Sequence, residues 1–134
     1  MNTLFPFMTT QSTDKVAKSF IIEAGKMVSL AEEEIRLGDV VKSILENENN
    51  ESFVSIAIWH YDQGVKKMRI ALGLLKQAKR LHLSEKYRAY VDLREKEARV
   101  KAKHAFDSKA ELENLMEEKK LGEDLEDGIR EVSA

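Results

Sequence analysis

The sequence contains no cysteine, and it has only one proline and six glycines among its 134 residues. Without cysteine the chain has no disulfide, no thiolate nucleophile and no cysteine-ligated zinc site, and we expect a cytoplasmic protein. Scarce proline and glycine argue against a sheet protein rich in turns. The composition instead favours long helices.

Long apolar runs are also missing. The stretch from Ile70 to Leu75 is typical of the longest, and it is far shorter than the roughly 20 residues that cross a bilayer. Residues Met1 to Thr13 lack the basic segment of a secretion signal, and their apolar run is too short for one. We therefore expect no transmembrane segment and no signal peptide.

Signatures of catalysis are absent as well. The sequence has no glycine-rich phosphate loop, and it has no Glu-x-x-His pair of the kind that binds di-iron centres in helical bundles. Its histidines, His60, His82 and His104, have no companion ligands or activated serine beside them. We expect no catalytic residue, no metal site and no cofactor, and so a protein that is not an enzyme.

What the sequence does contain is 43% hydrophobic and 34% charged residues, a mixture typical of amphipathic helices. A first helix is expected from just after Asp14, an N-cap residue, to Gly38, with another turn or two at residues 40–45. Acidic residues 46–51 read as a loop. The first helix carries apolar residues at intervals of three or four, which share one face: Val16, Phe20, Ala24, Met27, Ala31 and Ile35.

A second helix is expected from an N-cap at Ser52 to about His82, and Gly64 inside it indicates close approach of a neighbouring helix. The short connection at residues 82–84 forces a third helix to pack antiparallel to the second. The apolar face of the second helix contains Phe53, Ala57, Tyr61, Gly64, Met68, Ala71, Leu72, Leu75 and Ala78; that of the third contains Tyr87, Val91, Ala98, Ala102 and Ala105.

These patterns predict an all-α protein: an antiparallel three-helix bundle with a short C-terminal helical extension. The expected organisation is a flexible leader at residues 1–13, the bundle at residues 14–106, and an acidic helical or disordered extension at residues 107–134. A separate fourth element capped by Asp107 or Ser108 is expected to begin that extension.

Charge is strongly segregated along the chain. Residues 66–103 contain 13 basic and 4 acidic residues, a net charge of +9, whereas residues 107–134 contain 4 basic and 10 acidic residues, a net charge of −6. This pattern indicates an acidic partner for the basic region, or an acidic extension that folds back on it. Nucleic-acid binding is a second interpretation, although no stacking aromatics or standard motif accompany the cations. A solvated charged face is the plain alternative.

The segment from Ala57 to Val65 has the pattern A-x-x-x-Y-x-x-G followed by a hydrophobic residue, and Tyr90-Val91-Asp92 follows on a basic third helix. In these features the chain resembles the microtubule-interacting and trafficking (MIT) domain family over roughly residues 15–106. It departs from that family in the long segment 39–52 between the first two helices, and in Arg94, which stands where a small residue is usual.

The resemblance implies a non-enzymatic module that captures an acidic amphipathic peptide in membrane trafficking, of the ESCRT or autophagy type. The implied groove lies between the second and third helices, and its residues are Met68, Leu72, Leu75, Lys79, Arg88, Tyr90, Val91, Arg94, Ala98 and Arg99. An oligomeric structural subunit, associating through the wide apolar face of the first helix, is a further alternative.

Overall fold

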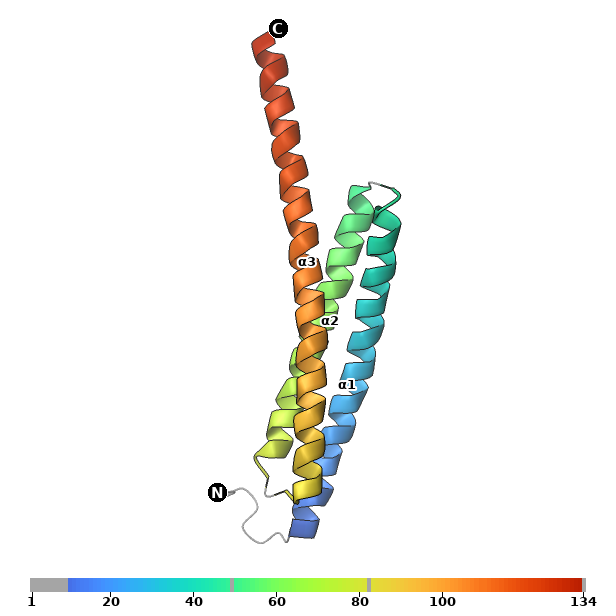
Figure 1. Cartoon of the computed structure of the whole chain (residues 1–134), viewed down its shortest axis with the longest axis vertical. Coiled ribbons are helices and arrows are strands. Elements are labelled where there is room, and N and C mark those ends of the chain that lie inside the picture. Colours follow the sequence, from blue (N-terminus) through green and yellow to red (C-terminus); the bar gives the residue numbers. More distant parts are fainter. Residues whose placement is uncertain (1–9, 49, 82, 134) are drawn as a thin grey trace.

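Three α-helices and no strand make up the described part of the computed structural model, which comprises residues 10–48, 50–81 and 83–133 (Figure 1). Helix α1 spans Thr10–Leu45, α2 spans Glu51–Lys79, and α3 spans Glu85–Ser133. Helix α2 runs antiparallel to the other two. The predicted all-α antiparallel three-helix bundle is confirmed.

Several predicted boundaries are wrong. Helix α1 begins at Thr10, inside the expected leader, and it passes through Gly38 without stopping; residues 1–9 of that leader lie outside the described part of the chain. Asn50 caps α2 in place of Ser52, because its side chain accepts a hydrogen bond from the Ser52 backbone N–H at 2.9 Å. The connection between α1 and α2 is therefore short.

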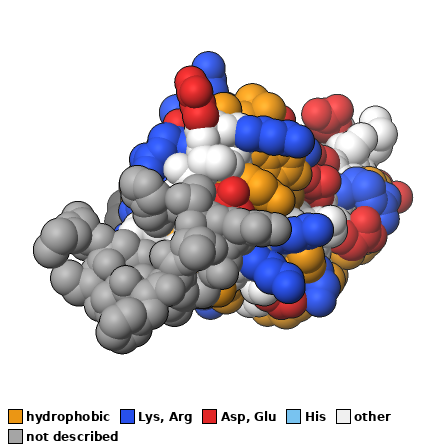
Figure 2. All heavy atoms as spheres, turned by 90° about the horizontal axis from the view of Figure 1, so that it is seen from below, with side chains coloured by type: hydrophobic (Ala, Val, Ile, Leu, Met, Phe, Trp, Pro, Cys, Tyr) orange, Lys and Arg blue, Asp and Glu red, His pale blue; other side chains and the backbone are white. Residues whose placement is uncertain are grey.

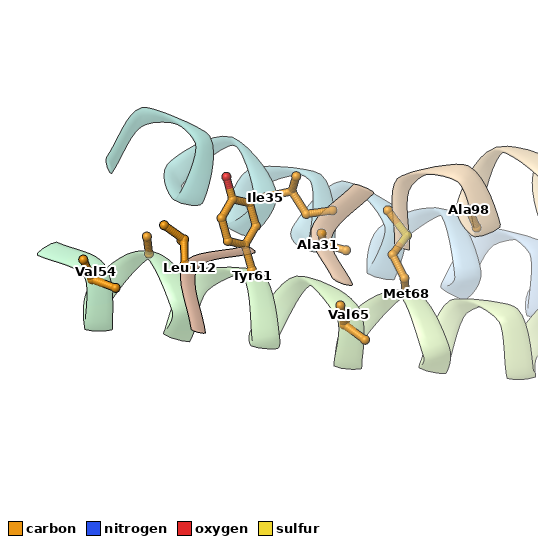
Figure 3. Close-up of a cluster of buried hydrophobic side chains, with 10 residues drawn as sticks. Ala31, Ile35, Val54, Tyr61, Val65, Met68, Ala98 and Leu112 are labelled. Carbon is orange, nitrogen blue, oxygen red and sulfur yellow. The ribbon is translucent and has the colours of Figure 1, made fainter. Parts of the chain in front are cut away.

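Helices α1 and α2 pack more extensively against each other than either packs against α3. Small buried residues recur on both helices in steps of seven: Ala17, Ala24, Ala31 and Gly38 on α1, and Ala57, Gly64, Ala71 and Ala78 on α2. A seven-residue step keeps one face turned toward the partner helix and produces a left-handed supercoil. Between these small residues lie the larger side chains of Tyr61 and Met68 (Figure 3) and of Leu75, all essentially buried.

Two glycines allow this close approach. A Cβ atom on Gly38 would lie 2.8 Å from Cε1 of Tyr61, and one on Gly64 would lie 2.7 Å from Cγ1 of Ile35. Both distances are far below ordinary carbon contacts. The prediction that Gly64 marks a close helix contact is confirmed, and Gly38 has the same function rather than that of a helix stop.

Helix α3 packs mainly on α2 and meets α1 along a narrower strip. Its buried stripe also advances by seven residues, through Val91, Ala98, Ala105 and Leu112. The expected separate fourth element does not form, because α3 continues unbroken from the bundle to Ser133. Beyond Leu112 it extends past the connection between α1 and α2, and every described side chain there is exposed except that of Lys119, which is half-buried (Figure 1).

Polar contacts tie α3 to the other helices. Lys109 Nζ lies 3.0 Å from Asp62 of α2, and the hydrogen bonds from Lys66 and Lys109 lower the pKa of Asp62. On the α1 side, Lys101 pairs with Glu32, and His104 lies 3.0 Å from Asp39. Lys42 of α1 also pairs with Glu111 of α3, at 2.8 Å. These pairs hold α3 against α1 along the stretch of α3 from Lys101 to Glu111.

Candidate binding groove

The predicted groove between α2 and α3 is filled by packing. Met68, Leu75, Val91 and Ala98 are at most 1% exposed, and they belong to the cores that join the helices. Leu72 is half-buried against the same core. These four buried side chains hold the bundle together, and a ligand would reach them only after α3 had moved away from α2.

The predicted rim cations are largely paired within the chain. Lys79 lies 2.9 Å from Asp92 and 3.1 Å from the buried carboxylate of Glu95, and its hydrogen bonds to Asp92 and then Glu95 raise its pKa. Arg99 lies 3.0 Å from the other oxygen of Glu95. Glu95 is only 3% exposed, unlike its neighbours Asp92 and Glu97 on the same helix. Its position between Val91 and Ala98 places it on the buried face of α3.

Three further predicted residues lie at the surface. Arg88 is exposed. Tyr90 is 42% exposed, and the guanidinium of Arg94 lies 5.0 Å from the centre of its ring while also pairing with Glu97 at 2.7 Å. The arginine that departs from the MIT pattern thus covers an aromatic ring. Tyr90 is directed toward α1 rather than α2, which places it in a different groove.

That groove lies between the N-terminal parts of α1 and α3, nearer to the start of both helices than the ion pairs that join them. Its volume is about 560 Å³. The lining is mainly apolar and consists of Lys18, Ile21, Ile22, Lys86, Tyr87, Ala89, Tyr90 and Leu93. Ile22 and Leu93, each about half exposed, form much of its open surface.

The groove is electropositive. Its only charged lining residues are Lys18 and Lys86, and neither has an ion-pair partner among the described residues. Seen from the end of the bundle where α1 and α3 begin, hydrophobic side chains reach the surface between lysine and arginine side chains (Figure 2). An apolar floor with two unpaired ammonium groups suits an amphipathic ligand that carries negative charge.

A second hollow, of about 740 Å³, lies in the angle between α3 and the connection of α1 to α2. Leu45 and Val54 contribute from the hairpin, and Leu115 and Met116 contribute from α3. Most of its charged residues are glutamates, so this hollow has a different electrostatic character from the groove.

The glutamates at positions 32–34 have three different environments, and Glu32 pairs with Lys101 of α3. Glu33 is exposed and pairs with Arg36. Glu34 is 18% exposed and lies 2.7 Å from Nδ1 of His60 and 3.3 Å from Lys67. Burial raises the pKa of Glu34, but the hydrogen bonds from His60 and Lys67 outweigh it and the net shift is downward. Within the described residues, no three His, Asp or Glu side chains are placed to share a metal ion.

Sequence reasoning missed Lys18, Ile21, Ile22 and Leu93 as residues of a common site. One signal was present: the first helix carries more apolar residues than one interface needs, and Ile21 widens its stripe. Helix register alone does not show which neighbour this excess faces.

No family model matches the chain, and no curated protein or solved structure is significantly similar to it. No described helix has an apolar stretch long enough to cross a membrane.

Proposed function

We propose that the protein is a non-enzymatic interaction module that binds an acidic amphipathic helix in the groove between α1 and α3. The observation that carries this proposal is the combination of an apolar floor, made largely by Ile21, Ile22, Tyr90 and Leu93, with two unpaired lysines. An amphipathic helix buries its apolar face in such a groove, and charge complementarity speeds its association.

The site proposed here replaces the groove between α2 and α3 as the ligand's location. Of the predicted binding residues, Tyr90 alone lines it. The remaining residues of that set pack in or against the core, pair with Glu95, or lie on the exposed face of α3. The class of ligand is unchanged, because the groove is again basic and apolar.

Nucleic-acid binding is a weaker proposal, since many cations of the basic segment are matched by acids of the same chain. Lys67 pairs with Glu34, Lys101 with Glu32, and Lys79 with Asp92 and Glu95. Cations that already have carboxylate partners give up those contacts before they neutralise phosphates.

The sequence resemblance to the MIT family supports a more specific proposal: the partner acts in membrane trafficking, of the ESCRT or autophagy type, and the protein acts in the cytoplasm. The pattern from Ala57 to Val65 carries this resemblance. In the fold, Tyr61 and Gly64 of the pattern pack α2 against α1.

The proposed function is tested with a fluorescent model peptide that places leucines along one helical face and glutamates elsewhere. We expect the full chain to bind it in anisotropy titrations, and to bind a twin with lysines in place of glutamates much more weakly. Lys18→Glu with Lys86→Glu should weaken binding of the acidic peptide by about tenfold or more, because like charges repel at the groove.

Lys76→Glu with Lys96→Glu is the matched control, since both side chains are exposed, lie outside the groove, and change the net charge equally. This control should retain most of the affinity apart from a small long-range effect. Equal loss in the two double variants, or no binding of the acidic peptide by the wild type, would show that the groove is not the site.

A further inference from the structure

A second stripe follows α3 outside its buried face, on the side that borders α1. The seven-residue repeat of α3 includes Val91, Ala98 and Lys119, and Leu93, Val100 and Leu121 each lie two positions after one of these residues. Tyr90 and Leu125 each lie one position before a residue of the same repeat, Val91 and Glu126. All five side chains are at least 42% exposed. On a helix with this repeat they fall along one line.

This stripe has two apolar ends and a mostly polar middle. Tyr90 and Leu93 form one end, within the groove; Leu121 and Leu125 form the other, on the extension. Their centres are about 47 Å apart along the helix axis at 1.5 Å per residue. Apart from Val100, the positions between the ends are polar: Glu97, His104, Asp107, Glu111, Asn114 and Glu118. Of these, His104 and Glu111 pair with Asp39 and Lys42 of α1.

The two ends carry opposite charge. Lys18 and Lys86 flank the groove, whereas Glu117, Glu118 and Asp124 surround the leucines of the extension. The extension is therefore an acidic amphipathic helix, of the chemistry that the groove accepts.

The extension does not reach the groove of its own chain. Helix α3 is continuous from Glu85 to Ser133, and the extension projects from the end of the bundle opposite to the groove (Figure 1). Folding back would require breaking α3. The prediction that the acidic extension covers basic residues of the same chain does not fit this arrangement. The extension can reach such a groove only on a second molecule.

We infer that two copies of this chain pair antiparallel along α3, so that the extension of each lies in the groove of the other. With Leu93 opposite Leu121, the twofold axis passes near Asp107, and both grooves are filled at once by a closed, symmetric contact. The inference rests on the proposed function, because it names the occupant of the same groove. Any other acidic helix would then compete with self-association.

Cysteine cross-linking tests the register, since the chain has no cysteine of its own. Ala89 lines the groove and Asp124 lies beside Leu121 and Leu125. Under mild oxidation, a mixture of Ala89→Cys and Asp124→Cys chains should form the mixed disulfide dimer far faster than either chain cross-links with itself. Ser55→Cys, exposed on α2, replaces Asp124→Cys as the control and should not form the mixed dimer.

Sedimentation velocity of the full chain supplies the second readout. We expect a concentration-dependent dimer that Leu121→Glu with Leu125→Glu converts to monomer, with unchanged helix content by circular dichroism. Mixing this variant with Lys18→Glu/Lys86→Glu should restore a dimer, because one intact groove then meets one intact extension. A monomeric wild type that nevertheless binds the acidic model peptide overturns the inference and leaves the proposed function standing. A dimer that lacks the mixed disulfide overturns it too.

Discussion

The hydroxyl of Tyr61 donates a hydrogen bond to Oδ1 of Asp39 at 2.5 Å, across the interface of α2 with α1. The tyrosine is fully buried, and burial together with this bond raises its pKa well above the ordinary value of 10.0. The group therefore remains a donor throughout the neutral range. Asp39 also lies 3.0 Å from His104 of α3, so one carboxylate joins all three helices.

Tyr61→Phe should lower the free energy of unfolding by about 1 kcal/mol, the net contribution of one such hydrogen bond. The loss stays small because Asp39 keeps His104 and is about half exposed. Tyr61→Ala should cost about 3–5 kcal/mol, since it also leaves a cavity. Urea unfolding followed by circular dichroism measures both changes; equal stabilities of wild type and Tyr61→Phe would contradict the role of the bond.

Gly38→Ala should destabilise the protein by about 1–3 kcal/mol, because the new methyl group would overlap the buried ring of Tyr61. Gly25→Ala, in the same helix, is the matched control. An added Cβ there meets nothing within 4 Å, so it should stabilise α1 by up to about 1 kcal/mol through helix propensity. Shifts of the same sign in the two thermal unfolding curves would argue against the close contact.

Lys79 and Glu95 should respond unequally to removal. Lys79→Met leaves a carboxylate that is 3% exposed with only the outer guanidinium of Arg99, and it should cost about 1–3 kcal/mol. Glu95→Met leaves cations that are 38% and 61% exposed and that water solvates. It should therefore change stability by less than about 1 kcal/mol. If chemical denaturation showed that Glu95→Met destabilises the protein more than Lys79→Met, the buried carboxylate would not be the group that requires a partner.

Acid should weaken the contact of α1 with α2 through Glu34. Its pKa in the folded protein lies below the ordinary 4.5, so the carboxylate stabilises the fold fully above about pH 4.5. That contribution is lost as the pH falls through the folded-state pKa. Glu34→Gln should flatten the decline of stability over this acid range, whereas Glu23→Gln, an exposed acid paired only with Lys26 of the same helix, should not. Unfolding curves measured across the acid range make the comparison.

Helical periodicity was enough to predict the three helices and most of the core, because burial on a helix follows directly from spacing. It did not predict that α1 continues through Gly38. The sequence shows a glycine but not the Tyr61 ring beside it, and only the pairing of helices reveals that contact. The environment of Glu95 also depends on helix pairing, since its partner Lys79 lies on another helix.

The candidate site was harder to predict than the fold. The charge and the apolar content of a binding surface were visible in the composition, and these qualities are found in the groove between α1 and α3. Which pair of helices leaves a gap depends on side-chain sizes at each interface. Alanines of α3 fit closely on α2. The apolar residues expected to bind a peptide, such as Val91 and Ala98, are therefore buried in the helix interface.

Beyond Leu112, α3 depends mainly on its own backbone for support, with few other contacts such as the ion pair of Lys119 with Glu51. Isolated helices of this length are only marginally stable in water. Amide protons of the extension should therefore exchange with solvent soonest, while those of the tightly packed α1–α2 pair are retained longest. Docking of the extension on another molecule would slow that exchange without any change in secondary structure. Protection at Leu121 and Leu125 would then report occupancy directly, residue by residue, in the unmodified chain.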